Sequence, residues 1–213
     1  EDKEDLSVDN REKNGFRITL SPVVAEFSLT DPNYPSDLYD HTFYGVSFDF
    51  SSVNTNKNNL FIGGGFSISN ASSSSTKQAR GIFYDSTYGN YDVYIEVQSL
   101  QTTFLYGLIG YDVELGEDSS FQPNLRIGLR SSSFKGELRY AWYSYADTYA
   151  SAQDSTESIG IEIDLPFKFS GDNSDGVGAG LCLCGTSITY TSGTTQFKVK
   201  TLGLFRIFAD FYF

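Results

Sequence analysis

The sequence lacks features on which several common classes of protein depend. It has no run of about 18 consecutive apolar residues, which excludes a transmembrane helix. It has one histidine, His41, so any histidine-dependent catalysis must use that residue. Its net charge of −12 argues against nucleic-acid binding, because nucleic acids attract basic surfaces. It has no methionine, and we therefore expect a mature product whose export signal has been removed.

Cysteine is also scarce. The two cysteines, Cys182 and Cys184, are two positions apart, which puts both side chains on the same face of a strand. A disulfide between them would be strained. Because there is no further cysteine and only one histidine, we expect no metal site and no cofactor. We interpret the two cysteines as small buried residues of a strand.

Aromatic residues, in contrast, are abundant, with 18 Phe and 15 Tyr against a single Trp. Transmembrane β-barrels place such residues in girdles at the two membrane interfaces. An aromatic-rich soluble β-sandwich is the alternative explanation. The apolar fraction of 39% fits either class, because a membrane barrel needs only every second strand residue to be apolar.

The end of the chain alternates between apolar and polar side chains. Counted back in twos from Phe213, the positions are apolar as far as residue 205, and an arginine and an aspartate fall between them. Extending the count to Phe197 leaves Lys198 and Lys200 on the charged set. The pattern predicts one strand of about 15 residues, longer than usual, with all its charges on one face.

The same alternation recurs along the chain, in residues 44–50, 60–68, 91–97, 109–115, 125–129 and 159–169. No segment has a helical period, so we predict an all-β protein built from antiparallel strands. A lipocalin-like barrel would turn the apolar faces inward, whereas a transmembrane up-and-down β-barrel turns them toward lipid. Charges of both signs lie on the polar faces, where they could pair across a narrow lumen, and this favours the transmembrane barrel. The clearest lipid-facing set is Ile159, Ile161, Ile163, Leu165, Phe167 and Phe169.

The number of strands should be even, because both ends of such barrels usually lie on the periplasmic side. We predict eight strands, over residues 16–29, 42–52, 59–70, 88–115, 123–146, 156–170, 176–190 and 196–213. The outer loops would then be residues 30–41, 71–87, 146–155 and 191–195. Ten strands are the alternative, obtained by splitting the two longest strands at 100–103 and 131–133, where each changes register as at a β-bulge.

The final strand resembles the C-terminal signal of bacterial outer-membrane β-barrels, in which a terminal aromatic residue closes the last strand. The residues that would carry this signal are Phe205, Ile207, Phe211 and Phe213. Residues 16–213 resemble the small outer-membrane barrels of the OmpA-like and OmpW-like groups. The resemblance implies an outer-membrane monomer whose partners are membrane lipids and, through the last strand, the barrel-assembly machinery. Residues 1–15 are acidic and poor in apolar side chains, and we expect a disordered extension there.

Eight strands make a barrel that its own side chains just fill, so inward charges should pair with one another. The charges that we assign to this lumen network are Arg126, Arg130, Arg206, Asp112, Glu114 and Asp210. Further candidates on the polar faces are Lys168, Lys198, Lys200, Asp49, Glu96, Glu162 and Asp164. Two interpretations remain open at this point: a plug of salt bridges and a polar conduction path.

His41 and the pair Asp85–Ser86 fall on two predicted outer loops. Together with the glycine-rich stretch 63–69 they are similar to the lipid A palmitoyltransferases, which are small outer-membrane barrels. This similarity implies acyl transfer, with His41 as general base and Ser86 near the acyl carbon. Inward faces crowded with charge do not suit an acyl chain, so we expect His41 to be exposed and separate from Ser86.

The sequence therefore favours an outer-membrane barrel with a structural or surface-interaction role, in which the outer loops would bind a surface ligand. The first alternative is a narrow channel for small or hydrophobic solutes. The second is a lipid-modifying acyltransferase. The fold alone does not choose among them.

Overall fold

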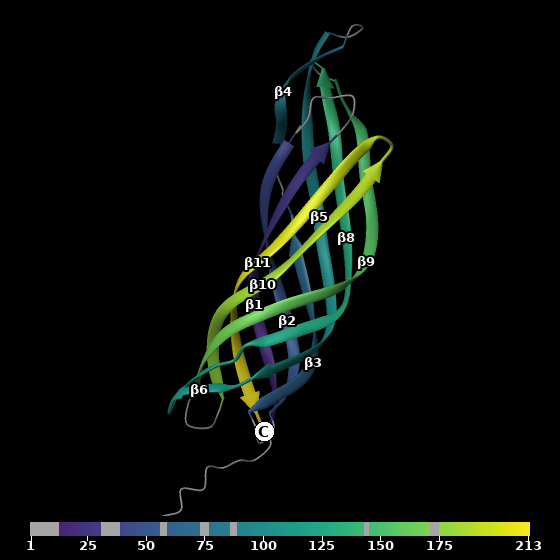
Figure 1. Cartoon of the computed structure of the whole chain (residues 1–213). Coiled ribbons are helices and arrows are strands. Elements are labelled where there is room, and N and C mark those ends of the chain that lie inside the picture. Colours follow the sequence, from purple (N-terminus) through teal and green to yellow (C-terminus); the bar gives the residue numbers. More distant parts are fainter. Residues whose placement is uncertain are drawn as a thin grey trace, which may run out of the picture.

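The computed structural model describes residues 13–30, 39–55, 59–72, 77–85, 89–142, 145–170 and 175–213. These residues form eleven strands of one antiparallel sheet (Figure 1). The strands are β1 (Lys13–Thr30), β2 (Tyr39–Thr55), β3 (Leu60–Ala71), β4 (Lys77–Asp85), β5 (Gly89–Tyr111), β6 (Val113–Gly116), β7 (Ser119–Phe121), β8 (Asn124–Trp142), β9 (Tyr145–Ser170), β10 (Gly176–Ser192) and β11 (Thr195–Tyr212). No helix in this part of the chain is long and apolar enough to cross a membrane.

Eight long strands close into a barrel. Their order around the wall is β1-β2-β3-β5-β8-β9-β10-β11, and the pairing of β11 with β1 completes the cylinder. Both β5 and β8 run without a break, so the prediction of eight strands is confirmed and the ten-stranded alternative is wrong. The three short strands lie off this path: β4 pairs with β5, and β6 and β7 form a hairpin beside β9.

Two of the predicted outer loops are wrong, because the sheet continues through them. Residues 71–87 contain β4, which pairs with β5. Residues 146–155 belong to β9, which begins at Tyr145 and pairs with β8. At the other end of the barrel, the strand predicted over 88–115 stops at Tyr111, because the following residues turn into the β6–β7 hairpin.

The lower part of the barrel, near the C-terminus in Figure 1, has an apolar outer surface. Strand register places Phe66, Leu105, Leu129 and Ile159 in one row across β3, β5, β8 and β9, and each is at least 40% exposed. The isoleucine and phenylalanine side chains of 159–169 also point outward, as predicted. That segment has the roughly 9–11 residues that a tilted strand needs to cross a bilayer. We call this surface the apolar band.

Above the apolar band the polarity of the wall is inverted. On β8, Lys135 is exposed whereas the neighbouring Phe134 is 1% exposed and points inward. The in-and-out alternation of β8 continues through 131–133 without interruption, so the register change predicted there is wrong. On β5 the alternation also continues through 100–103, but the pairing with β8 does change register close by, between Val97 and Ser99. The apolar residues change sides because the medium around the wall changes from lipid to water, which leaves the interior as the apolar side.

The last strand combines this inversion with a β-bulge. Phe197 and Val199 are buried and Lys198 and Lys200 are exposed, so the two lysines lie outside the lumen in which they were predicted. The pairing of β11 with both neighbouring strands changes register next to Gly203, which turns the following side chains over. The bulge lies close to the level at which the surrounding medium changes from lipid to water. The two reversals cancel, so apolar and polar residues alternate without a break along the sequence of β11.

In the upper part of the apolar band the cylinder begins to separate into two facing sheets. The pairing of β9 with β10 ends at Ile163 and Leu183, and higher up β9 diverges from the β10–β11 hairpin (Figure 1). The sheet β4-β5-β8-β9 then faces the sheet β10-β11-β1-β2. We call this two-sheet region the upper barrel. The aromatic rings between the sheets have centroids 4.9 to 6.0 Å apart and belong to Phe27, Phe134, Tyr190 and Phe197.

Candidate functional site

Inside the apolar band, alternation turns the polar side chains into the lumen, where they form ion pairs. The centre of this network is Arg126 on β8, which is 2% exposed. Its Nη1 atom lies 2.8 Å from Asp49 Oδ2 on β2, and its Nε atom lies 2.7 Å from Asp164 Oδ2 on β9. The guanidinium thus links strands from different sides of the barrel.

The ion pairs continue upward from Asp164. Arg206 on β11 places Nη1 2.8 Å from Asp164 Oδ2 and pairs through Nη2 with Glu162 on β9. Arg130 on β8 places Nη2 2.6 Å from the other oxygen of Glu162. The alternating series of acids and arginines runs Asp49–Arg126–Asp164–Arg206–Glu162–Arg130. We call it the charge ladder.

A second cluster occupies the lower end of the lumen. Arg17 on β1 binds both oxygens of Asp210 on β11, through Nε at 2.6 Å and Nη2 at 2.8 Å. The same Nη2 donates to Gln122 Oε1 at 2.5 Å, and Gln122 Nε2 donates to Asp112 Oδ2 at 2.9 Å. Lys168 Nζ lies 3.5 Å from Asp210 Oδ2. This cluster closes the barrel on the side of its C-terminus.

Aromatic rings stack on the cations of both clusters. The guanidinium of Arg126 lies 4.8 Å from the ring centroid of Tyr106, whose hydroxyl donates to Asp49 at 2.6 Å. Arg130 lies 4.7 Å from the ring of Phe104. Such contacts stabilise cations that have lost their water. Charges and rings together fill the cross-section of the lower lumen.

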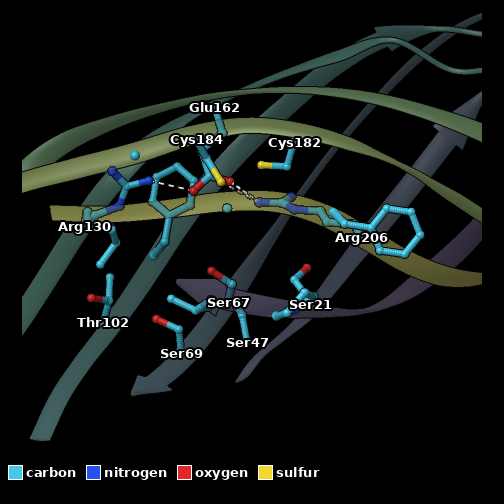
Figure 2. A pocket seen from close by; sticks show the side chains of 17 residues that line it. Ser21, Ser47, Ser67, Ser69, Thr102, Arg130, Glu162, Cys182, Cys184 and Arg206 are labelled. Carbon is cyan, nitrogen blue, oxygen red and sulfur yellow. Dashed lines mark hydrogen bonds and ion pairs between the residues drawn. The ribbon is translucent and has the colours of Figure 1, made fainter. Parts of the chain in front are cut away.

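Two small cavities interrupt this packing among the described residues. One has a volume of about 10 Å³ beside Arg17, which is room for roughly one water molecule. The other has a volume of about 60 Å³ and lies at the top of the charge ladder, beneath the upper barrel. Figure 2 shows its wall, on which Glu162, Arg206 and Cys184 lie opposite a row of hydroxyl groups. Neither cavity has the dimensions of a pore.

The predicted lumen charges fall into three groups. Three arginines, Arg126, Arg130 and Arg206, point inward and are ion-paired, but their partners are Asp49, Asp164 and Glu162. Asp210 pairs with Arg17, and Asp112 reaches the network through Gln122. Glu114 was wrongly placed in the lumen: it is exposed on β6, because the chain leaves the barrel wall after Tyr111. The side chain of Glu96 lies outside the described residues.

Sequence reasoning missed several polar residues of the lumen, among them Arg17, Tyr106 and Gln122. For Arg17 the signal was present, since Phe16, Ile18 and Leu20 alternate with it in the same way as on the other strands. Tyr106 falls within the strand predicted over 88–115, but outside the two segments, 91–97 and 109–115, whose alternation indicated direction. Gln122 lies between β7 and β8, where no alternation exists to indicate its direction.

For the residues suggested for acyl transfer, the structure describes only the strand positions of His41 and Asp85. His41 lies within β2, opposite Phe27 on β1, and not on a loop as predicted. Asp85 ends β4 and pairs with Gly89. The side chain of His41 and the whole of Ser86 lie outside the described residues, so their separation stays a prediction.

The four apolar residues of the C-terminal signal point outward from β11. Their side chains are between 40% and 88% exposed: Phe205, Ile207, Phe211 and Phe213. They belong to the apolar band, on the face opposite to Arg206 and Asp210.

No family model and no curated protein sequence matches this chain. Among solved structures, the outer-membrane protease OmpT of Escherichia coli matches with a TM-score of 0.55 at 9% identity, covering 94% of this chain and 97% of that one. Neisserial surface protein A matches with a TM-score of 0.41 at 11% identity, covering 90% and 95%. The outer-membrane protein AlkL matches with a TM-score of 0.42 at 14% identity, covering 100% and 96%. The chain thus has the closed antiparallel fold of an outer-membrane β-barrel.

Proposed function

We propose that this protein is a non-conducting outer-membrane barrel that holds the upper barrel outside the cell as a binding surface. The observation that carries the proposal is the lumen. Its charge ladder and lower cluster join side chains of opposite walls over the height of the apolar band. Carboxylates and guanidiniums in contact leave no continuous polar path for a solute, and separating them would leave buried charges unpaired.

The length of the strands supports a role outside the membrane. Strand β9 continues from Ile159, at the top of the apolar band, to Tyr145. At about 3.3 Å per residue this is roughly 45 Å of additional strand. A barrel that served only to span the bilayer would not need an upper barrel with its own aromatic core. Long strands with polar outer faces instead suit the recognition of a surface partner.

The other partners follow from the same arrangement. The apolar band would contact membrane lipids, and the outward aromatic residues of β11 would be recognised by the barrel-assembly machinery. Residues 13–15, predicted as part of a disordered extension, belong to β1 and pair with β2 and β11. Residues 1–12 would form the extension on the periplasmic side, since β1 starts at the end of the barrel that holds Phe213. We propose that the barrel is a monomer, because the lower part of its wall, as far up as Ile163 and Leu183, is a closed ring of paired strands.

Conductance in planar lipid bilayers tests the proposal. The refolded wild-type barrel should produce no defined conductance steps. A variant in which Arg17, Arg126 and Arg206 are all replaced by serine should leak, because it removes arginines from both the charge ladder and the lower cluster that close the lumen. Stable conductance steps from the wild-type protein would show that the narrow channel is the correct alternative.

The acyltransferase alternative has its own test. Lipid A extracted from cells that express the wild-type protein should have the same mass as lipid A from cells without it. An added acyl chain that disappears in both His41→Ala and Ser86→Ala variants would establish the enzyme and refute a purely binding role.

A further inference from the structure

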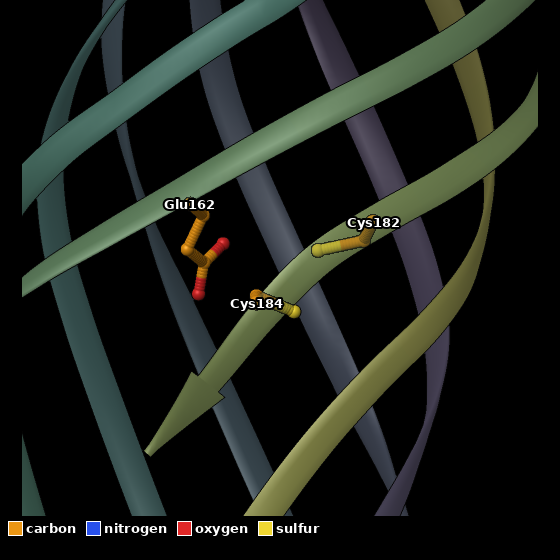
Figure 3. A group of neighbouring side chains, drawn as sticks. All are labelled: Glu162, Cys182 and Cys184. Carbon is orange, nitrogen blue, oxygen red and sulfur yellow. The ribbon is translucent and has the colours of Figure 1, made fainter.

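Two thiols and a carboxylate meet at the top of the charge ladder. Cys182 and Cys184 project inward from β10, and Glu162 projects inward from the neighbouring strand β9 (Figure 3). One ligand atom from each residue can be chosen so that all three lie within 4.8 Å of one another. Cys182 and Glu162 are buried, at 1% and 6% exposure, and Cys184 is half-buried.

The local structure of the three strands produces this meeting. Both cysteines face inward because they are two residues apart, while Leu181 and Leu183 face outward at 59% and 61% exposure. The pairing of β10 with β11 changes register between Leu181 and Cys184. Opposite this irregularity stands Gly203, where a Cβ atom would lie only 2.2 Å from Cys184 Sγ. The absence of a side chain at Gly203 is therefore what makes room for the thiol.

We propose that Cys182, Cys184 and Glu162 bind a thiophilic divalent cation of the zinc class, such as Zn²⁺ or Cd²⁺. Two cysteine sulfurs and one carboxylate oxygen are donors that Zn²⁺ accepts in proteins, and thiolates select soft ions over Mg²⁺ or Ca²⁺. The site goes beyond the proposed function, since a closed barrel that binds a surface partner does not require it.

The charges of the site favour a divalent ion. The ladder holds three arginines against three carboxylates, and the two free cysteines beside it add no charge as long as they are protonated thiols. Binding converts two S–H groups and one M²⁺ into two metal–sulfur bonds and two released protons. The charge of the site is then unchanged, so the balance of the ladder is preserved. A monovalent ion bound by the same two thiolates would leave one uncompensated negative charge.

The surroundings supply the rest of a metal site. Arg130 and Arg206 hold the two oxygens of Glu162, which fixes the carboxylate while leaving a lone pair on each oxygen. Arg206 Nη2 also lies 3.9 Å from Cys184 Sγ, where a positive charge stabilises a thiolate. The cavity of about 60 Å³ borders all three ligands and has room for a water molecule as fourth ligand (Figure 2).

An entry path lies next to the site. The pairing of β9 with β10 ends at Ile163 and Leu183, each adjacent in sequence to a ligand. Above that point β9 and β10 no longer pair with each other, and we expect an ion to reach the thiols between these two strands without crossing the charge ladder.

Cadmium titration of the reduced, refolded barrel in detergent micelles tests the site directly. We expect thiolate-to-metal charge-transfer absorption in the ultraviolet that saturates at one Cd²⁺ per chain and is reversed by competition with Zn²⁺. The Cys182→Ser and Cys184→Ser variants should lose this absorption, and Glu162→Gln should weaken binding about 10- to 100-fold. Glu157→Gln, an exposed acid on the same strand, is the matched control and should bind as the wild type does.

The folded state of each variant is checked by its migration on unheated gels, because folded and unfolded barrels migrate differently. If Cys182→Ser does not fold, the more exposed Cys184→Ser keeps the test decisive. A reduced wild-type barrel that shows no charge-transfer absorption at any Cd²⁺ concentration overturns the proposal. Absorption that persists in a folded Cys184→Ser variant overturns it as well. Neither result changes the conductance expected of the closed lumen, so the two proposals fail separately.

Discussion

Replacing Arg126 by alanine is the most informative perturbation of the lumen. The change removes ion pairs of 2.8 Å to Asp49 and 2.7 Å to Asp164, and both acids are at most 3% exposed. Breaking a buried ion pair by removing one partner typically costs about 3–5 kcal/mol. Asp164 keeps Arg206 and Asp49 keeps the hydroxyl of Tyr106, so we expect a loss near the lower limit, about 3 kcal/mol.

Urea unfolding of the barrel in lipid vesicles, followed by the fluorescence of the single tryptophan, measures this loss. Lys198→Ala is the matched control: it also removes one cation, but from the exposed outer face, where substitutions typically change stability by less than about 0.5 kcal/mol. The double variant Arg126→Ala/Asp49→Asn should be more stable than the sum of the single changes predicts, because the buried carboxylate left without its arginine is gone.

The reasoning fails if Arg126→Ala costs no more than Lys198→Ala. That result would mean that water enters the lumen and solvates the two acids, in which case the charge ladder is not a plug. Strict additivity of the double variant would lead to the same conclusion about the contact between Arg126 and Asp49.

Three further changes test the apolar band, the upper barrel and the wall. Ile163→Arg places a charge in lipid and should cost roughly 2–4 kcal/mol by the same unfolding assay, whereas Ile163→Val should cost little; equal costs would contradict a lipid-facing side chain. Phe134→Ala should cost about 3–5 kcal/mol and Phe134→Leu clearly less, since the ring packs between the sheets of the upper barrel. Gly63→Ala should reduce folding yield on unheated gels, because its Cβ would lie 1.9 Å from the carbonyl oxygen of Ser52, whereas Gly107→Ala has nothing closer than 4.0 Å and should fold normally. Equal yields would mean that β2 and β3 are less closely paired than described.

The architecture could be predicted because a barrel wall repeats one local rule. Alternation along 159–169 separates lipid-facing from lumen-facing side chains residue by residue, and the structure has that separation. Most strand ends followed from the same rule, whereas the even strand number followed from placing both ends of the chain on the periplasmic side. The rule has no information about where the surrounding medium changes, so residues 131–133 were read as a bulge when they mark the exit of β8 from the apolar band.

The partners in the lumen could not be predicted, because they depend on the third dimension. Arg126 and Asp49 are 77 residues apart and lie on strands that are not neighbours in the wall. Which acid an arginine reaches depends on strand stagger and on the shape of the filled interior. The same limit applies to the cysteines. Their spacing excluded an unstrained disulfide, but the local pattern could not show that Glu162, from the preceding strand, lies next to them.

The interiors of the two halves of the barrel are filled by different kinds of side chain, and this limits what the molecule can do. The lower lumen is held by ion pairs inside an apolar wall, and the upper barrel is held by aromatic rings inside a polar wall. Phe104, on which Arg130 stacks, belongs to the same buried cluster as Tyr106 and Leu108, and it also lines the cavity of about 60 Å³ that lies between the two halves. The barrel would therefore support a partner bound at the upper barrel rigidly. A conformational change transmitted across the membrane would require ion pairs of the charge ladder to break.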